Sequence, residues 1–144
     1  MTGEVTGVTM LETEQSIRQD LELLGDALNR MEYILGCARV APGIPETERT
    51  PEALVADCQT NTWLMAEWDN GALRLRTDSE SFLVKGALYL IGEIYNGRTR
   101  AEVADYSCTL LDYEKFIGLF NPEQKKGLRH VLDTLKEGGG DHVS

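Results

Sequence analysis

Apolar residues recur every three or four positions along residues 13–38, a spacing that predicts two consecutive helices. Thr13 is the candidate N-cap of the first helix, which we expect to end near Gly25. Asp26 is the candidate cap of the second helix. Its buried face is predicted to comprise Leu28, Met31, Ile34, Leu35 and Ala38, with Cys37 packing beside them.

Apolar and polar residues alternate at mid-chain, where a β-hairpin is predicted. Residues 62–68 and 72–77 form the expected strands, joined by Asp69-Asn70-Gly71. Asn-Gly is a favoured hairpin turn because both residues adopt positive φ at low cost. In the second strand, Leu73 and Leu75 should share one face.

The most apolar part of the chain, residues 82–94, follows the hairpin and predicts a central helix. Asp78 or Ser79 is its candidate cap, and Asn96-Gly97 its expected end. Within this helix, Gly86 would let a neighbouring element approach closely.

The remaining chain predicts helices only. Thr99 and Glu102 form a capping box, residues 110–117 a short amphipathic piece, and Asn121-Pro122 the start of a final helix. Gly138-Gly139-Gly140 is expected to end that helix. The predicted fold class is therefore α+β, with several helices packed on one face of a small antiparallel sheet. The buried stripe of the final helix should be Leu128, Val131, Leu132 and Leu135.

Length and charge narrow the functional classes. The 144 residues fit a single domain, 1–144, with ends at about 1–10 and 138–144 expected to be disordered. A net charge of −10 without a basic cluster makes nucleic acid an unsuitable partner. There is no apolar run long enough for a membrane span and no signal peptide, so a cytoplasmic protein is expected. Three cysteines without paired spacing fit a reducing compartment, and the two histidines have no metal-ligand spacing.

Cys58 is the candidate functional residue. It lies between a proline-containing loop, residues 41–51, and the first predicted strand, so a large partner could reach it. Position alone leaves open whether Cys58 is reactive or simply buried, as free cysteines often are. Lys85 also has two alternative interpretations. Its side chain could extend from the core to water, or its ammonium group could stabilise a nearby thiolate.

A longer sequence pattern around Cys58 helps to decide whether this cysteine is reactive. Residues 49–64, which run RTPEALVADCQTNTWL, are followed by Asp78-Ser79-Glu80 and Val84-Lys85-Gly86. In order and spacing, these segments resemble the SufE family of sulfur acceptors, and the similarity extends from about Tyr33 to Leu128.

The resemblance implies a function and a fold. Cys58 would be the nucleophile that takes persulfide sulfur from a SufS-like, pyridoxal-phosphate-dependent cysteine desulfurase, stimulates that enzyme and passes sulfur to an iron–sulfur cluster scaffold. The chain would then be a carrier without turnover of its own, and it would need no cofactor besides the covalent persulfide on Cys58. The family fold is similar to that of the iron–sulfur scaffold proteins.

Three positions depart from the family pattern. Asp57 stands where glycine usually precedes the reactive cysteine, and Ala53 where asparagine is usual. A carboxylate beside Cys58 should disfavour thiolate formation. Gln124 occupies a place where arginine is common.

Other functions stay open from the sequence. A scaffold would need several thiolates converging on iron, which the spacing of Cys37, Cys58 and Cys108 does not indicate. A docking module could regulate a desulfurase without carrying sulfur, and Asp57 favours that alternative. A cysteine hydrolase would need a histidine base, for which only His130 in the final helix is a candidate.

Overall fold

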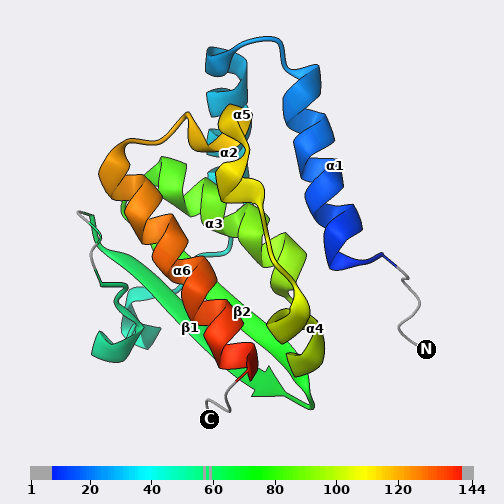
Figure 1. Ribbon diagram of the computed structural model, residues 1–144. Helices are drawn as coiled ribbons and strands as arrows, with labels where there is room; N and C mark the ends of the chain where they lie inside the picture. Colours follow the sequence, from blue (N-terminus) through cyan, green and yellow to red (C-terminus); the bar gives the residue numbers. More distant parts are fainter. Residues whose placement is uncertain (1–7, 57, 59, 141–144) are drawn as a thin grey trace.

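A two-stranded antiparallel hairpin and the helix that follows it form the centre of the fold (Figure 1). The computed structural model describes residues 8–56, 58 and 60–140. This arrangement confirms the predicted α+β class. In chain order, the elements are α1 (Met10–Leu23), α2 (Ala27–Val40), the 3-10 turns η2 (Glu46–Glu48) and η3 (Pro51–Ala53), β1 (Thr62–Asp69), β2 (Ala72–Ser79), α3 (Phe82–Tyr95), α4 (Arg100–Asp105), the 3-10 turn η4 (Leu110–Asp112), α5 (Glu114–Ile117) and α6 (Pro122–Gly140).

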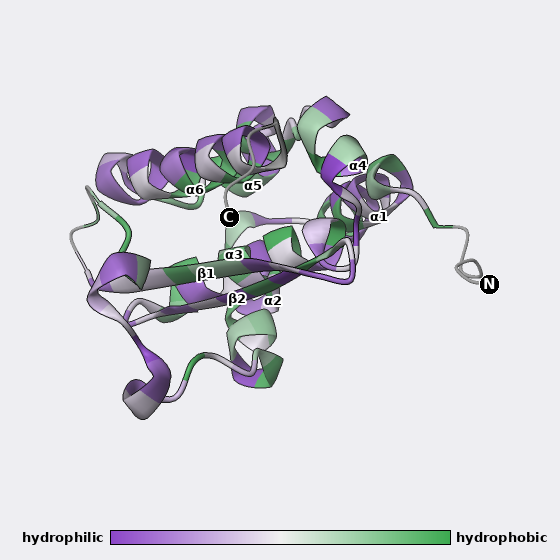
Figure 2. Ribbon diagram, turned by 90° about the horizontal axis from the view of Figure 1, so that it is seen from below, coloured by the Kyte–Doolittle hydropathy of each residue, from purple (hydrophilic) through white to green (hydrophobic). Residues whose placement is uncertain are grey.

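The hairpin has two covered faces. Leu73 and Leu75 are buried in the main core, which they share with α3 and with the predicted stripe of α6. On the opposite face, Trp63 packs with Ile44 and Ala53 from the preceding loop in a second, smaller core. In Figure 2, the hairpin and α3 form a middle level. Helices α5 and α6 lie on one side of this level, and α2 lies on the other.

The hairpin turn confirms the sequence prediction. Asn70 and Gly71 have φ of 54° and 82°, and Asp69 pairs with Ala72 across them. Positive φ at both central residues matches the twist of the strands. β2 runs to Ser79, two residues further than predicted, so Asp78 and Ser79 belong to the strand.

The outer edge of β2 is covered by the chain that leaves α3. The N–H of Leu73 donates to the carbonyl of Arg98 at 2.8 Å, and the N–H of Gly97 donates to the carbonyl of Leu73 at 2.9 Å. The side-chain amide of Asn96 both donates to and accepts from the backbone of Leu75. The predicted helix stop at Asn96-Gly97 therefore also pairs an otherwise open sheet edge.

Helix α3 lies directly against α2 at Gly86. A Cβ atom at this position would be 2.0 Å from the carbonyl oxygen of Ile34. Only glycine allows the two helix backbones to approach this closely, which confirms the predicted role of Gly86.

Two helix starts were predicted wrongly. Helix α1 begins one turn before Thr13, because Thr9 and Glu12 form a reciprocal capping box that places Met10 in the core. Helix α3 is capped by Ser81, whose hydroxyl accepts from the N–H of Val84. Asp78 and Ser79 are unable to cap it because they end the preceding strand.

Two further details of the helices differ from prediction. Leu28 is exposed at the start of α2, whereas Ile34 and Ala38 are buried as expected. Helix α6 continues through Gly138 to Gly140. Glycine weakens a helix by about 1 kcal/mol relative to alanine but does not forbid it.

Within residues 8–56, 58 and 60–140, none of the helices combines the length and hydropathy required to cross a membrane.

Candidate functional site

The loop that carries Cys58 is closed at its base. The N–H of Val55 donates to the carbonyl of Thr62 at 2.8 Å, and the N–H of Glu80 donates to the carbonyl of Asn61 at 2.9 Å. These bonds attach both ends of the segment to the open end of the hairpin. Cys58 thus lies on a loop between regular elements, as predicted, and the structure adds that both ends of this loop are anchored.

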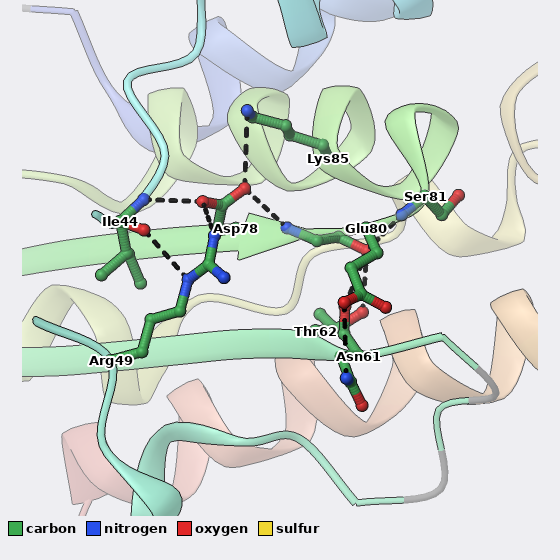
Figure 3. A network of polar contacts seen from close by, with 9 residues as sticks. Ile44, Arg49, Asn61, Thr62, Asp78, Glu80, Ser81 and Lys85 are labelled. Atoms are coloured by element: carbon green, nitrogen blue, oxygen red, sulfur yellow. Dashed lines mark hydrogen bonds and ion pairs between the residues drawn. The ribbon is translucent and has the colours of Figure 1, made fainter. Parts of the chain in front are cut away.

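A chain of hydroxyl groups reinforces this base (Figure 3). The side-chain oxygens of Thr62 and Ser79 are 2.9 Å apart and hydrogen-bonded, in register across the strand pair. The Ser79 hydroxyl also accepts from the N–H of Ser81, the residue that caps α3. The start of α3 and the end of the Cys58 loop are therefore coupled through Ser79.

Asp78 anchors the loop that precedes Cys58. Its Oδ2 accepts from the N–H of Ile44 at 2.8 Å and from Arg49 Nη2 at 3.0 Å. Its Oδ1 accepts from the N–H of Ser79 at 2.8 Å and lies 3.5 Å from Lys85 Nζ. Burial by itself would raise the pKa of Asp78, but the hydrogen bonds from Ile44 and Arg49 outweigh it, so the pKa lies below its ordinary value.

Arg49 and Gly43 complete this anchor. The Nε of Arg49 donates to the carbonyl of Ile44 at 3.0 Å, and the guanidinium lies over the ring of Trp63 at 3.9 Å from its centroid. Gly43 has a φ of 65°, and a Cβ there would be 2.7 Å from the Asp78 carboxylate. The small second core and the polar anchor are therefore one unit, which holds the chain that leads to Cys58.

Lys85 belongs to this anchor and not to the surroundings of Cys58. Its ammonium pairs with Asp78, and Lys85 does not line the cavity that contains Cys58. The interpretation of Lys85 as a cation beside the thiolate is therefore wrong for this structure. The side chain remains about one-fifth exposed, consistent with a lysine that reaches toward water from a buried base.

Cys58 lines a cavity of about 390 Å³ between its own loop, the start of α3 and the first three turns of α6. The loop side is polar, with the hydroxyls of Thr60 and Thr62. The helix side is largely apolar, and its residues are Val84, Leu88, Leu128 and Val131. Asn121, Glu123 and Gln124 line the α6 end. The half-buried thiol of Cys58 is therefore both sheltered and open to a cavity.

Gly127 of α6 makes room for the Cys58 thiol. A Cβ atom on Gly127 would be 2.5 Å from Cys58 Sγ, closer than such contacts occur in proteins. The first turns of α6 and the Cys58 loop are therefore in direct contact, although 69 positions separate the two residues in the sequence.

Gly127→Ala should displace the Cys58 thiol from its resting position. The added methyl would overlap Sγ, so the Cys58 side chain must rotate away or its loop must shift. We expect this displacement to accelerate the alkylation of Cys58 by a maleimide about tenfold, the factor that 1.4 kcal/mol gives. The measurement is the alkylation rate under native conditions. Gly36→Ala is the matched control, because that helical glycine has space for a methyl group. Equal alkylation rates in both variants would contradict the contact.

The other two cysteines have different surroundings. Burial raises the pKa of Cys37 to about 11, with a further contribution from the charge of Glu93. Burial also raises the pKa of Cys108 to about 12, near the buried carboxylate of Glu14. Both groups therefore stay protonated at neutral pH, and neither lines the Cys58 cavity.

The alternatives from the sequence find little support in this geometry. In the part of the chain that the structure describes, no three or more His, Cys, Asp or Glu residues are grouped so as to hold a metal ion. His130 is exposed on α6 and is not among the residues that line the Cys58 cavity. Asp57, the carboxylate predicted to disfavour thiolate formation, lies outside the described residues.

Comparison with known proteins assigns the chain to a family. A family model described as the SufE, Fe-S metabolism associated domain matches residues 15–138. The chain belongs to the SufE family. Family membership implies a role in iron–sulfur metabolism.

Individual SufE relatives are similar over most of the chain. An uncharacterized SufE-like protein of Rhizobium etli is 27% identical over 130 residues, covering 84% of this chain and 85% of that protein. Another, from Rhizobium meliloti, is 25% identical and covers 83% of this chain and 89% of that protein. The chloroplastic quinolinate synthase of Arabidopsis thaliana is 26% identical over 113 residues, which are 78% of this chain but 16% of the plant enzyme.

A solved structure has the same fold. The solution structure of a hypothetical protein from Thermus thermophilus aligns with a TM-score of 0.61 at 22% identity, covering 86% of this chain and 93% of that one. At this identity the likeness supports the fold alone.

Two features of the candidate site were missed from the sequence. Gly127 lies inside a helix, where a glycine facing a loop cannot be told from one that faces solvent. Asp78 was interpreted as a helix cap, although its neighbours Thr77 and Ser79 continue the strand alternation. That alternation was the available signal that Asp78 belongs to the sheet.

Proposed function

We propose that Cys58 accepts persulfide sulfur from a cysteine desulfurase and passes it on for iron–sulfur cluster assembly. The observation that carries this proposal is the setting of Cys58. Cys58 lines the 390 Å³ cavity and is half-buried on a closed loop, whereas Cys37 and Cys108 lie outside this cavity and burial raises the pKa of both. Membership of a family associated with iron–sulfur metabolism supports the same function.

The proposed transfer is an exchange between two sulfur–sulfur bonds. The thiolate of Cys58 attacks the outer sulfur of a cysteine persulfide on the donor. A bond forms between Cys58 Sγ and this sulfur, while the bond from the sulfur to the donor cysteine breaks. The electron pair stays with the donor cysteine, which leaves as a thiolate and takes up a proton. There is no net oxidation or reduction, so no co-reactant is needed.

The cavity suits a cysteine that carries an additional sulfur atom. Its apolar α3 and α6 walls, including Val84 and Leu128, would shield a persulfide from water and from thiol reductants. The hydroxyl of Thr60 on the loop side is a potential hydrogen-bond donor to the outer sulfur, whereas the hydroxyl of Thr62 is already bonded to the carbonyl of Thr60 and to Ser79. Sheltering of this kind would keep the persulfide intact between donor and receiver.

The donor in this proposal is a SufS-like cysteine desulfurase, in which pyridoxal phosphate supplies the chemistry that releases sulfur from cysteine. Removal of the sulfur from the donor cysteine frees the desulfurase for another cycle, which would account for its stimulation. The receiver is an iron–sulfur cluster scaffold. We place the exchange in the cytoplasm, where free thiols persist.

Intact-protein mass spectrometry tests the proposal. The protein is mixed with a SufS-type desulfurase and free cysteine, and the modified peptide is then mapped. We expect a mass increase of one sulfur atom on the peptide with Cys58, reversed by a thiol reductant. A stimulated desulfurase without added sulfur would overturn the carrier function and favour a docking module. Bound iron after anaerobic purification with iron and sulfide would instead favour a scaffold.

A further inference from the structure

A second hollow lies beside the Cys58 cavity, between the start of α6 and the segment of η4 and α5. Its volume is about 530 Å³. The floor is apolar, formed by Leu111, Ile117 and Pro122. The rim carries three cations, Lys125, Lys126 and Arg129, and one carboxylate, Glu123. The prediction that the chain has no basic cluster is therefore wrong at this surface. We call this the lysine hollow.

Two of the three rim cations lack partners among the described residues. Arg129 forms an ion pair with Asp112 at 3.3 Å. Lys125 and Lys126 form no side-chain hydrogen bond or ion pair with any residue that the structure describes. All fourteen lysines and arginines lie in the described part, and among them only Arg74 is similarly without a partner there.

The position of these lysines on the helix does not explain them. Helix α6 begins at Pro122, so Lys125 and Lys126 follow directly after its first turn. The N-terminal end of a helix carries a partial positive charge, which favours acidic and not basic side chains. Both lysines are also exposed, so neither contributes to the core. Their charge is therefore available to an external anion.

The lysine hollow adjoins the mouth of the Cys58 cavity. Glu123 lines both. Gly127, which contacts the Cys58 thiol, follows Lys126 directly in the chain. A partner bound in the hollow would therefore lie next to the sulfur-accepting residue.

We propose that the lysine hollow docks an acidic segment of the sulfur donor, an inference that rests on the proposed function. The residues of the hollow indicate what this segment contains. Its carboxylates would pair with Lys125 and Lys126, and an adjacent apolar side chain would pack on Leu111 and Ile117. The chain as a whole, with its net charge of −10, repels such a segment. The local cations therefore select both the partner surface and its orientation.

Charge reversal in the hollow tests this proposal. Lys126→Glu should raise the Kd for a SufS-type desulfurase of the same organism about tenfold at roughly 50 mM salt, and by less at roughly 500 mM, where the charges are screened. Lys125→Glu with Lys126→Glu should weaken binding further. Binding is measured by isothermal titration calorimetry in a Cys58→Ala background, so that no sulfur is transferred. Arg74→Glu is the matched control, since it makes the same charge change at the third cation without a partner in the described chain.

The outcomes separate docking from sulfur transfer. A Kd that rises for Lys126→Glu and not for Arg74→Glu supports the hollow as the docking surface. An equal rise in Kd for both variants would mean that only the net charge of the protein matters, and it would overturn the proposal. So would unchanged binding of the double variant while the wild-type protein still acquires sulfur on Cys58, in which case the proposed function stands. Failure of Cys58 to acquire sulfur is a failure of the proposed function, whatever the lysine variants do.

Discussion

Cys58→Ser should abolish sulfur acceptance while leaving the fold intact. The transfer requires a thiolate that attacks the donor persulfide, and a serine hydroxyl is not a sulfur nucleophile at neutral pH. Removal of the nucleophile is expected to lower the rate of sulfur uptake by at least about 10³-fold. Stability should change by no more than about 1 kcal/mol, because the substitution conserves shape at a half-buried position.

The measurement is sulfur uptake from a SufS-type desulfurase, followed by mass spectrometry over time. Cys37→Ser is the matched control, since Cys37 is also half-buried but has a pKa of about 11 and lies outside the Cys58 cavity. The control should accept sulfur at the wild-type rate. Uptake by Cys58→Ser at that same rate would assign the sulfur to another residue and refute the carrier function of Cys58.

Asp78→Asn should lower the free energy of unfolding more than any other substitution proposed for this protein. The amide would keep the shape of the carboxylate but not its charge, leaving Arg49 and Lys85 without their anionic partner. Loss of a buried ion-pair partner typically costs about 3–5 kcal/mol, and we expect roughly 3 kcal/mol because both cations retain some exposure. The free energy of unfolding from urea titration measures this loss.

The pH dependence of the unfolding free energy shows whether the stability lost in Asp78→Asn comes from the charge of Asp78. Because the pKa of folded Asp78 lies below its ordinary value of 3.8, the carboxylate stabilises the folded protein above that value. This contribution is lost as the pH falls through the folded pKa. The gap in unfolding free energy between wild type and Asp78→Asn should therefore be full at pH 7 and narrow below about pH 4. Ser107→Asn, at an exposed loop position, should show no such gap. A gap that is constant with pH would mean that packing, and not charge, holds the loop.

Local interactions explain which parts of the fold could be predicted from the sequence. The Asn70-Gly71 turn, the Thr99–Glu102 capping box and the buried stripe of α6 all depend on residues close together in the chain. The prediction of α1 failed because two threonines were available as caps. Thr9 has a glutamate three positions later, whereas Thr13 has a serine there.

The site could be predicted only in part. The loop position of Cys58 follows from the prolines and from the strand pattern around it. Its contact with Gly127, and the ion pair of Lys85 with Asp78, depend on how α6 and the proline-containing loop pack on the hairpin. The periodicity of a sequence does not encode such packing. Lys85 is an example: the residues around it match the family pattern, but its ammonium group pairs with Asp78 and not with Cys58.

The closed base of the Cys58 loop limits how far sulfur can be carried. Seven peptide units join Val55 to Thr62, and their ends are held together by a hydrogen bond of 2.8 Å. At roughly 3.5 Å per residue, an arch of this length extends no more than about 12 Å from its base. A tether this short cannot swing between two proteins seated at separate places. Under the proposed function, donor and receiver would then occupy the same site in turn, and delivery would follow a ping-pong order in which the first partner leaves before the second arrives.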